Sequence, residues 1–343
     1  MKNDNFKMDD SIRLPNLVTV GMDIDQKFHL DNVSNDEVLY HYTGIDGFMS
    51  ILENRDFWIS NIRFMNDAQE FKNGCKICKE ILQDRIVESG QKLSNLEENY
   101  KTYYERLLRI CDENESGGIF NISSTDIFAL SFCEKGDLLT QWQVYGQNGV
   151  SIGFKNVHNS IENGMALMDE DQYNVEIKSI ATDHMNPHDE VFFLARKVIY
   201  DDKVKTELIK TILQYGIDFI DACPEHDVDI AVNGISDLLF YYFALMKDKN
   251  FSHEREKRLL IITNRDYSKV HFRTRKGVLI PYLKMKILDL NCRPHMRFPV
   301  EQIVIAPGPK QVYIAESIRY FLEKKQLGYL KDKITISNIP FRD

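Results

Sequence analysis

Segments with strand character lie near both ends of this chain, and long helical segments together with further strands lie between them. Runs of β-branched and aromatic residues predict strands at 38–42 and 57–60, and similar runs return after residue 257. Strands so far apart in sequence must pair with one another to cover their edges. No low-complexity linker divides the chain. The sequence therefore predicts an α+β fold with a single domain over 36–343.

The remaining elements follow from hydrophobic periodicity. Further strands are predicted at 127–133, 150–154, 172–180, 195–200, 258–263, 270–273, 278–288, 302–305 and 334–339. Short helices are expected at 45–52 and 311–325, and two helical inserts at 67–115 and 202–248. Residues 1–35 carry little periodicity and many Asp, Asn and Lys residues, which predicts a loosely ordered N-terminal arm.

Composition excludes several classes of protein. The 343 residues are 43% hydrophobic and 28% charged, enough for a substantial core. No long apolar run indicates a membrane span, and the first residues lack the apolar region of a secretory signal, so a cytoplasmic protein without membrane partners is expected. The formal net charge of −9 disfavours binding to nucleic-acid phosphates, and no clear acidic metal-binding cluster supports nucleic-acid hydrolysis.

The cysteines do not indicate a disulfide framework or a metal site. Six cysteines in so long a chain fit a reducing compartment. Cys75 and Cys78 form a C-x-x-C pair, but no second pair follows, and structural zinc requires four ligands. We therefore predict no metal site.

Two polar motifs interrupt segments that are otherwise strand-like. The first contains His41, and the second contains Glu254 and Glu256 just before the apolar run that starts at Leu259. Ionisable side chains are rare at buried strand positions unless they have a partner or a task. The two motifs thus suggest one composite site. The alternative is that His41 is a hydrogen-bonded core histidine and the glutamates lie on a solvated strand face.

The spacing of the glutamates leads to a further expectation. Alternation along a strand through Leu259 and Ile261 would place Glu254 and Glu256 on the same face, with Arg258 on the opposite face unless a bulge intervenes. Repulsion between the two carboxylates would then raise the pKa of one of them. A separate basic cluster, Arg273, Arg275 and Lys276, could line an anionic-ligand cleft or belong to the solvated surface.

Several longer motifs recur in a fixed order along the chain. They are Tyr40-His41-Tyr42-Thr43, Phe57-Trp58-Ile59-Ser60, Met65-Asn66-Asp67-Ala68-Gln69-Glu70, Leu130-Ser131-Phe132-Cys133, Gln141-Trp142-x-x-Tyr145-Gly146, Val198-Ile199-Tyr200-Asp201, the segment 251–259, Leu279-Ile280-Pro281-Tyr282, the segment 303–309 and Ser337-Asn338-Ile339-Pro340-Phe341-Arg342. Over most of residues 38–342 this pattern resembles a widespread bacterial family of domains of unknown function, whose members often occur beside abortive-infection and other phage-defence genes.

The resemblance implies a fold and a set of residue roles. The family's fold is similar to that of ADP-ribosyltransferases, a mixed or antiparallel β core in which a His-containing strand and a Glu-containing strand frame an NAD cleft. His41 would then contact a ribose hydroxyl, and Tyr145 or Trp142 would stack on nicotinamide. Glu256 would be the catalytic carboxylate, with Glu254 as the alternative. The family glutamate is commonly followed by Trp and then Arg, whereas Lys257 and Arg258 follow here.

The same resemblance implies a cofactor-binding set. Tyr42 and Thr43 adjoin the histidine, and a planar guanidinium from Arg63, Arg275 or Arg342 would suit the pyrophosphate. NAD is expected as the substrate, with no metal.

Two functions from different classes are therefore expected. The first is an NAD-consuming enzyme, either a mono-ADP-ribosyltransferase with an unidentified macromolecular acceptor or an NAD glycohydrolase, acting as a phage-defence effector or toxin. The alternative is a non-catalytic module of a defence system that senses a nucleotide or binds a partner protein. Release of nicotinamide would distinguish the two.

Overall fold

The fold was analysed in a computed structural model, which describes residues 17–30, 37–65, 68–89, 95–115, 125–146, 148–155, 165–167, 192–222, 228–264, 270–287 and 300–340. Contacts divide the chain into two compact units. The helical unit comprises Met1–Leu30, Phe71–Ser123 and Asp201–Phe243, and the sheet unit comprises Asp31–Glu70, Ser124–Tyr200 and Ala244–Asp343. Most of both predicted helical inserts therefore belongs to one compact unit, where the sequence predicted insertions into a single domain.

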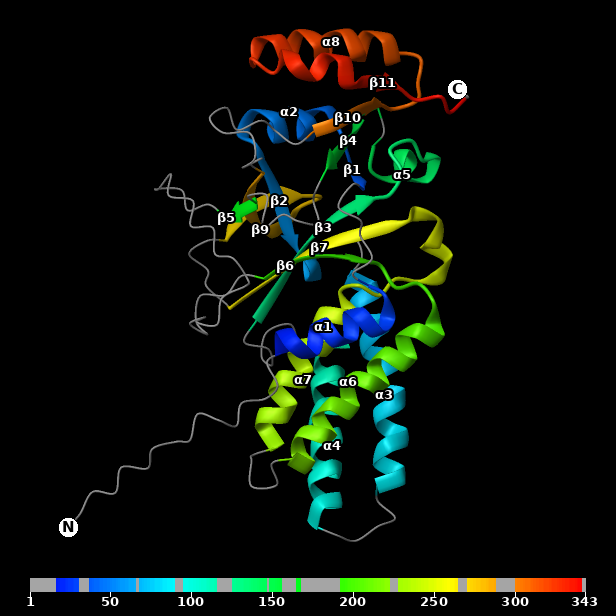
Figure 1. The fold of residues 1–343 in the computed structure, drawn as a ribbon, viewed down its shortest axis with the longest axis vertical. Coiled ribbons are helices and arrows are strands. Elements are labelled where there is room, and N and C mark those ends of the chain that lie inside the picture. Colours follow the sequence, from blue (N-terminus) through cyan, green and yellow to red (C-terminus); the bar gives the residue numbers. More distant parts are fainter. Residues whose placement is uncertain are drawn as a thin grey trace, which may run out of the picture. The chain divides into compact units, whose positions relative to one another are not determined.

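The helical unit contains five helices among its described residues. They are α1 (Leu17–Phe28), α3 (Ala68–Ser89, in this unit from Phe71), α4 (Asn95–Glu115), α6 (Asp202–Ala222) and α7 (Val228–Phe243). The helix α7 contacts both α4 and α6, and Figure 1 shows these three lying side by side. Most side chains of α7 are buried, because its sequence is apolar on nearly every face.

The helix α1 replaces the predicted loosely ordered arm over Leu17–Phe28, the part of that arm where the structure describes a helix. Val20 and Ile24 are buried, and α1 contacts α6 and α7. The buried carboxylate of Asp25 accepts a hydrogen bond of 3.0 Å from the Tyr242 hydroxyl. An acidic residue and Gly21 inside the helix weaken its amphipathic pattern, and the partner that satisfies Asp25 lies more than two hundred residues away. The helix is therefore stabilised by tertiary contacts that local periodicity does not reveal.

The sheet unit is built on a single branched sheet. Its described strands are β1 (Val38–Thr43), β2 (Asp56–Asn61), β3 (Thr125–Cys133), β4 (Val150–Lys155), β5 (Met165–Leu167), β6 (Phe192–Lys197), β7 (Glu256–Asn264), β8 (His271–Arg275), β9 (Val278–Ile287), β10 (Val300–Ile305) and β11 (Ile334–Ile336). Among these strands all pairs are antiparallel except β10 with β11. The predicted α+β class with a mostly antiparallel sheet is confirmed. The strand predicted at 172–180 lies outside the described residues.

The strand β3 is the branch point of the sheet (Figure 1). One edge of β3 pairs with β7 along its whole length, from Thr125 to Cys133. The other edge is shared, because β1 pairs at Cys133 while β2 pairs at Phe128 and Ala129. The strands β1 and β2 therefore diverge on either side of Ser131. Helix α2 (Ile45–Asn54) connects them.

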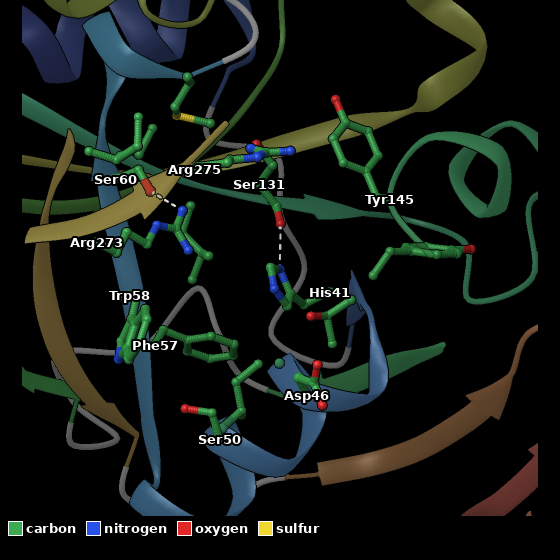
Figure 2. A pocket seen from close by; sticks show the side chains of 18 of the residues that line it. His41, Asp46, Ser50, Phe57, Trp58, Ser60, Ser131, Tyr145, Arg273 and Arg275 are labelled. Carbon is green, nitrogen blue, oxygen red and sulfur yellow. Dashed lines mark hydrogen bonds between the residues drawn. The ribbon is translucent and has the colours of Figure 1, made fainter. Parts of the chain in front are cut away.

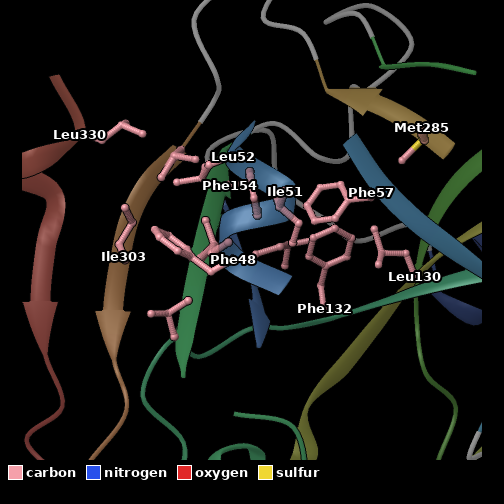
Figure 3. Packing of buried hydrophobic residues seen from close by; sticks show 14 of the residues in the cluster. Phe48, Ile51, Leu52, Phe57, Leu130, Phe132, Phe154, Met285, Ile303 and Leu330 are labelled. Atoms are coloured by element: carbon pink, nitrogen blue, oxygen red, sulfur yellow. The ribbon is translucent and has the colours of Figure 1, made fainter. Parts of the chain in front are cut away.

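The core of the sheet unit lies between the sheet and the helices α2 and α8 (Gln311–Lys324). Figure 3 shows Phe48 of α2 among apolar side chains of several strands, including Phe57, Phe154 and Ile303. The rings of Phe57 and Phe154 meet edge to face, with centroids 5.1 Å apart. Each such side chain contributes about 1.5–3 kcal/mol when it is fully buried. This core fixes β1, α2 and β2 in position around the point where the two strands diverge.

Candidate functional site

A pocket of about 490 Å³ opens in the sheet unit where β1 and β2 diverge. It is lined by side chains of β1, α2, β2, β3 and β8, by Ile280 of β9, by the end of the 3₁₀ helix η1 (Ile62–Phe64) and by the end of α5 (Leu139–Val144). Figure 2 shows this arrangement. Of the residues predicted for the site, the pocket lining includes His41, Tyr42, Thr43, Tyr145 and Arg275. The sequence motif around His41 therefore does belong to a cavity.

The imidazole of His41 is held by the branch point of the sheet. Its Nδ1 lies 3.1 Å from the backbone oxygen of Ser131, which is in the part of β3 between the pairing sites of β1 and β2. The ring also makes edge contacts with Phe57 and Phe132, at centroid distances of 5.3 and 6.0 Å. Burial lowers the pKa of His41, the hydrogen bond to Ser131 raises it and the charge of Arg273 lowers it, with a net decrease from 6.5.

The hydrogen bond to Ser131 fixes which nitrogen of His41 carries the proton. A carbonyl oxygen can only accept, so Nδ1 must donate. Because the lowered pKa favours the neutral ring, Nε2 then keeps a lone pair and acts as an acceptor. In the described residues no hydrogen bond to Nε2 is present. His41 is thus suited to accept a hydrogen bond from a hydroxyl group of a ligand.

Arg273 is held rigidly on the opposite side of the pocket in Figure 2. Its Nη2 donates to Ser60 Oγ at 2.8 Å, and the guanidinium carbon lies 5.9 Å from the centre of the Trp58 ring. Trp58 is itself stacked on Tyr282, with centroids 4.6 Å apart and an interplanar angle of 24°. Arg273 Nε is buried and has no hydrogen-bond partner within the described part of the chain. The arginine is therefore preorganised and retains an unused donor.

Arg275 adds a second positive charge to the pocket. It lies two residues after Arg273 on β8, so both side chains emerge on the same face of the strand. Burial lowers the pKa of Arg273, and the charge of Arg275 lowers it further. Neither arginine forms an ion pair with an acidic residue that the structure describes. Uncompensated arginines in a pocket favour an anionic ligand.

The two aromatic candidates for nicotinamide stacking differ in position. Tyr145, which directly follows α5, lines the pocket, whereas Trp142 does not. Trp142 is buried, with its ring 4.6 Å from that of Tyr42 and its Nε1 donating to Asp137 Oδ1 at 2.7 Å. Trp142 is therefore a packing residue, and only Tyr145 of the pair can contact a ligand in this pocket.

The other basic residues predicted for the site are not among the described residues that line the pocket. Arg63 lies in η1 and its backbone N–H donates to Asn61 Oδ1 at 3.1 Å, but its side chain does not line the pocket. Arg342 lies outside the described residues, as do Asn66 and Asp67. Lys276 of the basic cluster is exposed and lies outside the pocket lining.

The two predicted catalytic glutamates do not line the pocket, which corrects their expected placement. Both are buried, and both carboxylates contact Lys247 Nζ, at 2.9 Å for Glu254 and 3.0 Å for Glu256. Arg258 Nε donates to Glu256 at 2.7 Å. Two cations and two anions therefore form a neutral buried cluster, which we call the ionic cluster. Its carboxylates are occupied by protein cations.

The expected strand geometry of the glutamates was also wrong. Glu254 ends a 3₁₀ helix, η2 (Lys249–Glu254), and Arg255 follows with a left-handed φ of 48° before Glu256 begins β7. The two carboxylates converge through this turn and not through strand alternation. Arg258 lies on the same face as Glu256, because residues two apart on a strand share a face.

The pKa of Glu256 is lowered, so Glu256 is not a carboxylate whose pKa is raised by repulsion between the two glutamates. Burial raises it, but the charges of Arg258 and Lys247 and the hydrogen bonds from Arg258 and Ser131 outweigh burial and lower the pKa to about 2. Lys247 lies between the two carboxylates and offsets their repulsion. Glu256 therefore remains ionised. Its hydrogen bond to Ser131 links the ionic cluster to the strand segment that also holds His41.

Sequence reasoning did not assign several polar or aromatic residues of the lining to the site, among them Asp46, Trp58 and Ser60. Trp58 and Ser60 alternate along β2, so their shared face could be expected, but their role depends on Arg273 of a distant strand. Asp46 lies in the first turn of α2, where an acidic residue is ordinary. Its position in a pocket leaves no signal in the sequence.

Metal-binding side chains do not gather in the described ranges, where no group of three or more His, Cys, Asp or Glu residues is arranged to hold an ion. Cys75 and Cys78 are buried cysteines of α3, and both share hydrogen bonds with Cys111 of α4. In the same ranges, every helix is too short or too polar to cross a lipid bilayer.

Comparison with known protein families gave a match to one part of the chain. Residues 141–259 match a family described as protein of unknown function (DUF2971), in agreement with the resemblance to a family of domains of unknown function. The match includes Tyr145 and Glu256 but ends before β8, and it begins after β1. Searches of the curated proteins and of the solved structures found no match.

Proposed function

We propose that the pocket binds NAD or a closely related pyrophosphate nucleotide, and that the protein consumes NAD as a mono-ADP-ribosyltransferase or NAD glycohydrolase. One observation carries the proposal. Arg273 is fixed by Ser60 and Trp58, lacks an acidic partner among the described residues, and keeps a buried Nε donor without a partner. An unpaired buried donor costs about 1–3 kcal/mol, and a ligand oxygen would remove this cost.

The other pocket residues fit the same ligand. Arg273 and Arg275 would hold the pyrophosphate, because guanidinium groups bind phosphate oxygens in a bidentate manner. His41 Nε2 would accept a hydrogen bond from a ribose hydroxyl, and Tyr145 offers an aromatic ring for one of the two bases of the dinucleotide. The pocket volume of about 490 Å³ is within the range for small-molecule sites.

The proposal extends to the fold and to the biological role. The divergence of β1 and β2 at β3 supports an ADP-ribosyltransferase-like cleft, in which the histidine strand forms one wall. The resemblance to families found beside phage-defence genes supports a role as a defence effector or toxin. An NAD-consuming effector would act by depleting the cell of NAD or by modifying a macromolecule.

A second candidate is a non-catalytic module that senses the same nucleotide. The position of Glu254 and Glu256 favours it, because both carboxylates lie outside the pocket lining and are engaged by Lys247. A module of this kind would bind NAD without releasing nicotinamide.

Binding of NAD to the purified full chain, measured by titration calorimetry, tests the shared part of both candidates. Arg273→Ala is expected to weaken binding about 10–100-fold, because hydrogen bonds to charged groups contribute about 1.5–3 kcal/mol. The matched control is Arg319→Ala, an exposed arginine of α8 that pairs with Glu316, and it should bind like the wild type. Equal affinities for the wild type and Arg273→Ala would contradict the proposed site.

Nicotinamide release by the same preparation separates the two candidates. Release by the wild type supports the enzyme. Binding without release, in the presence of a cell extract that supplies acceptors, supports the sensor.

A further inference from the structure

Cleavage of NAD requires a carboxylate near the ribose, and the expected one is not in the pocket. The reaction passes through a state with positive charge at the ribosyl C1′, which a nearby carboxylate stabilises. Glu256 is turned into the ionic cluster and Glu254 shares Lys247 with it. We infer that Asp46 supplies the catalytic carboxylate for NAD cleavage, an assignment that rests on the proposed function.

Asp46 is placed where a ligand can reach it. It lies in the first turn of α2, two residues after the N-cap Gly44, and its side chain is exposed and lines the pocket. Figure 2 shows its carboxylate on the same side of the pocket as His41. Neither an ion pair nor a side-chain hydrogen bond occupies Asp46 among the described residues. It is thus available, unlike the glutamates.

The only other carboxylate in the described lining is Asp56, at the start of β2. Asp56 is 7% exposed and has an interaction inside the protein, although its Oδ1 is buried without a hydrogen-bond partner among the described residues. The side chain of Asp46 is exposed, so a ligand in the pocket reaches its carboxylate more easily than the buried one of Asp56. Asp46 is therefore the better candidate.

The positive and negative side chains of the pocket lie at different ends, and NAD has charges of the opposite sign at matching positions. Arg273 and Arg275 of β8 lie toward one end in Figure 2, Asp46 of α2 lies toward the other, and His41 lies between them. NAD carries negative charge on its pyrophosphate and positive charge on its nicotinamide ring. With the pyrophosphate on the arginines, the nicotinamide ribose extends past His41 toward Asp46. The field of the pocket then favours the charge distribution of the transition state.

Hydrolysis of NAD at this site requires water as the only further reactant. The bond between ribosyl C1′ and the nicotinamide nitrogen breaks, and its electron pair stays on the nitrogen, so that neutral nicotinamide leaves. The positive charge at C1′ is stabilised by the Asp46 carboxylate. A water molecule adds to C1′ through an oxygen lone pair and gives one proton to Asp46, which passes it to solvent. The products are nicotinamide, ADP-ribose and one proton. In transfer, an acceptor nucleophile takes the place of water.

Asp46→Asn tests this assignment in the full chain by nicotinamide release and NAD binding. The variant keeps the shape of the side chain and removes its charge. The maximal rate is expected to fall about 100–1,000-fold, because the carboxylate acts mainly on the charge that develops at C1′ in the transition state. The Kd for NAD should rise by less than about fivefold, because an exposed charge pair contributes at most about 1 kcal/mol to binding of the cationic ring. Asp46→Glu, which restores the charge at a shifted position, should recover part of the rate.

The matched control is Glu53→Gln on the same helix. Glu53 pairs with Lys325 at 2.8 Å and does not line the pocket, so its rate should stay within about twofold of the wild type. Circular dichroism of each variant checks the fold.

The outcomes separate this inference from the proposed function. Equal nicotinamide release by the wild type and a folded Asp46→Asn variant would overturn the role of Asp46 and leave NAD cleavage standing. Binding of NAD by the wild type without release would overturn the role of Asp46 and favour the sensor. If the wild type does not bind NAD at all, the proposed function fails together with the inference.

Discussion

Glu256 and Arg273 are both charged side chains with buried atoms, but only Glu256 has its counter-charges within the described part of the protein. Lys247 and Arg258 hold the carboxylate of Glu256, whereas Arg273 contacts a hydroxyl and an aromatic ring. At the scale of single residues, this difference separates a structural charge from one that is available to a ligand. The sequence shows that both residues are charged, but it does not show which residues they contact in the folded protein.

The structural role of Glu256 predicts a large effect on stability. Glu256→Gln should lower the free energy of unfolding by about 3–5 kcal/mol at neutral pH, because Lys247 and Arg258 then stay buried with one carboxylate fewer. The matched control is Glu316→Gln in the exposed pair with Arg319, for which a change below about 1 kcal/mol is expected. Urea denaturation measures both, and an effect of Glu256→Gln as small as the control would contradict the account.

The same measurement has a predicted dependence on pH. The pKa of Glu256 in the folded protein, about 2, lies below its usual value of 4.5. The stabilisation by its ionised form is therefore fully present above about pH 4.5 and is lost as the pH falls toward about 2. The difference between wild type and Glu256→Gln should shrink over this interval.

At the scale of elements, the junction of β1, α2 and β4 sets the shape of the pocket. Val150 at the start of β4 is paired with Thr43 at the end of β1. The preceding residue, Gly149, lies so close to this junction that an added Cβ would meet the backbone oxygen of Thr43 and the Cα of Gly44. These backbone atoms cannot move without displacing β1 and the first turn of α2.

Gly149→Ala is therefore expected to lower the free energy of unfolding by about 1–3 kcal/mol through overpacking. NAD binding should weaken as well, because Thr43 and Asp46 line the pocket. The comparison is Gly21→Ala within α1, where an added Cβ meets open space and alanine favours the helix, so the midpoint of thermal unfolding should not fall. Thermal unfolding of both variants measures the difference. Equal midpoints for Gly149→Ala and wild type would show that the junction adapts.

Many of the strands and helices could be predicted from the sequence. The strands at 38–42, 57–60 and 127–133 and the helices at 45–52 and 311–325 were predicted within a few residues, because their apolar periodicity is strong. The helix α1 was missed because a buried Asp25 interrupts its pattern. The predicted placement of Glu254 on a strand was wrong, because Glu254 ends a 3₁₀ helix and Arg255, with a left-handed φ, separates it from the strand. The alternation of side chains along a strand therefore does not apply to Glu254.

At the scale of the whole molecule, an acidic chain carries an arginine-containing pocket. The formal net charge is −9, yet Arg273 and Arg275 lie together without an acidic partner among the described residues. The overall charge disfavours an extended phosphate backbone as ligand, but it gives no indication that two arginines line one pocket. The two motifs of the expected composite site have different places: the histidine motif lines the pocket, and the carboxylate motif forms the ionic cluster.

The central claim is that this pocket binds a pyrophosphate nucleotide through Arg273 and His41, and a structure of the full chain with NAD tests it most directly. The account predicts a pyrophosphate oxygen about 2.7–3.2 Å from Arg273 Nε and a ribose hydroxyl at the same range from His41 Nε2. NAD bound elsewhere on the molecule, with Arg273 Nε still without a partner, would contradict it.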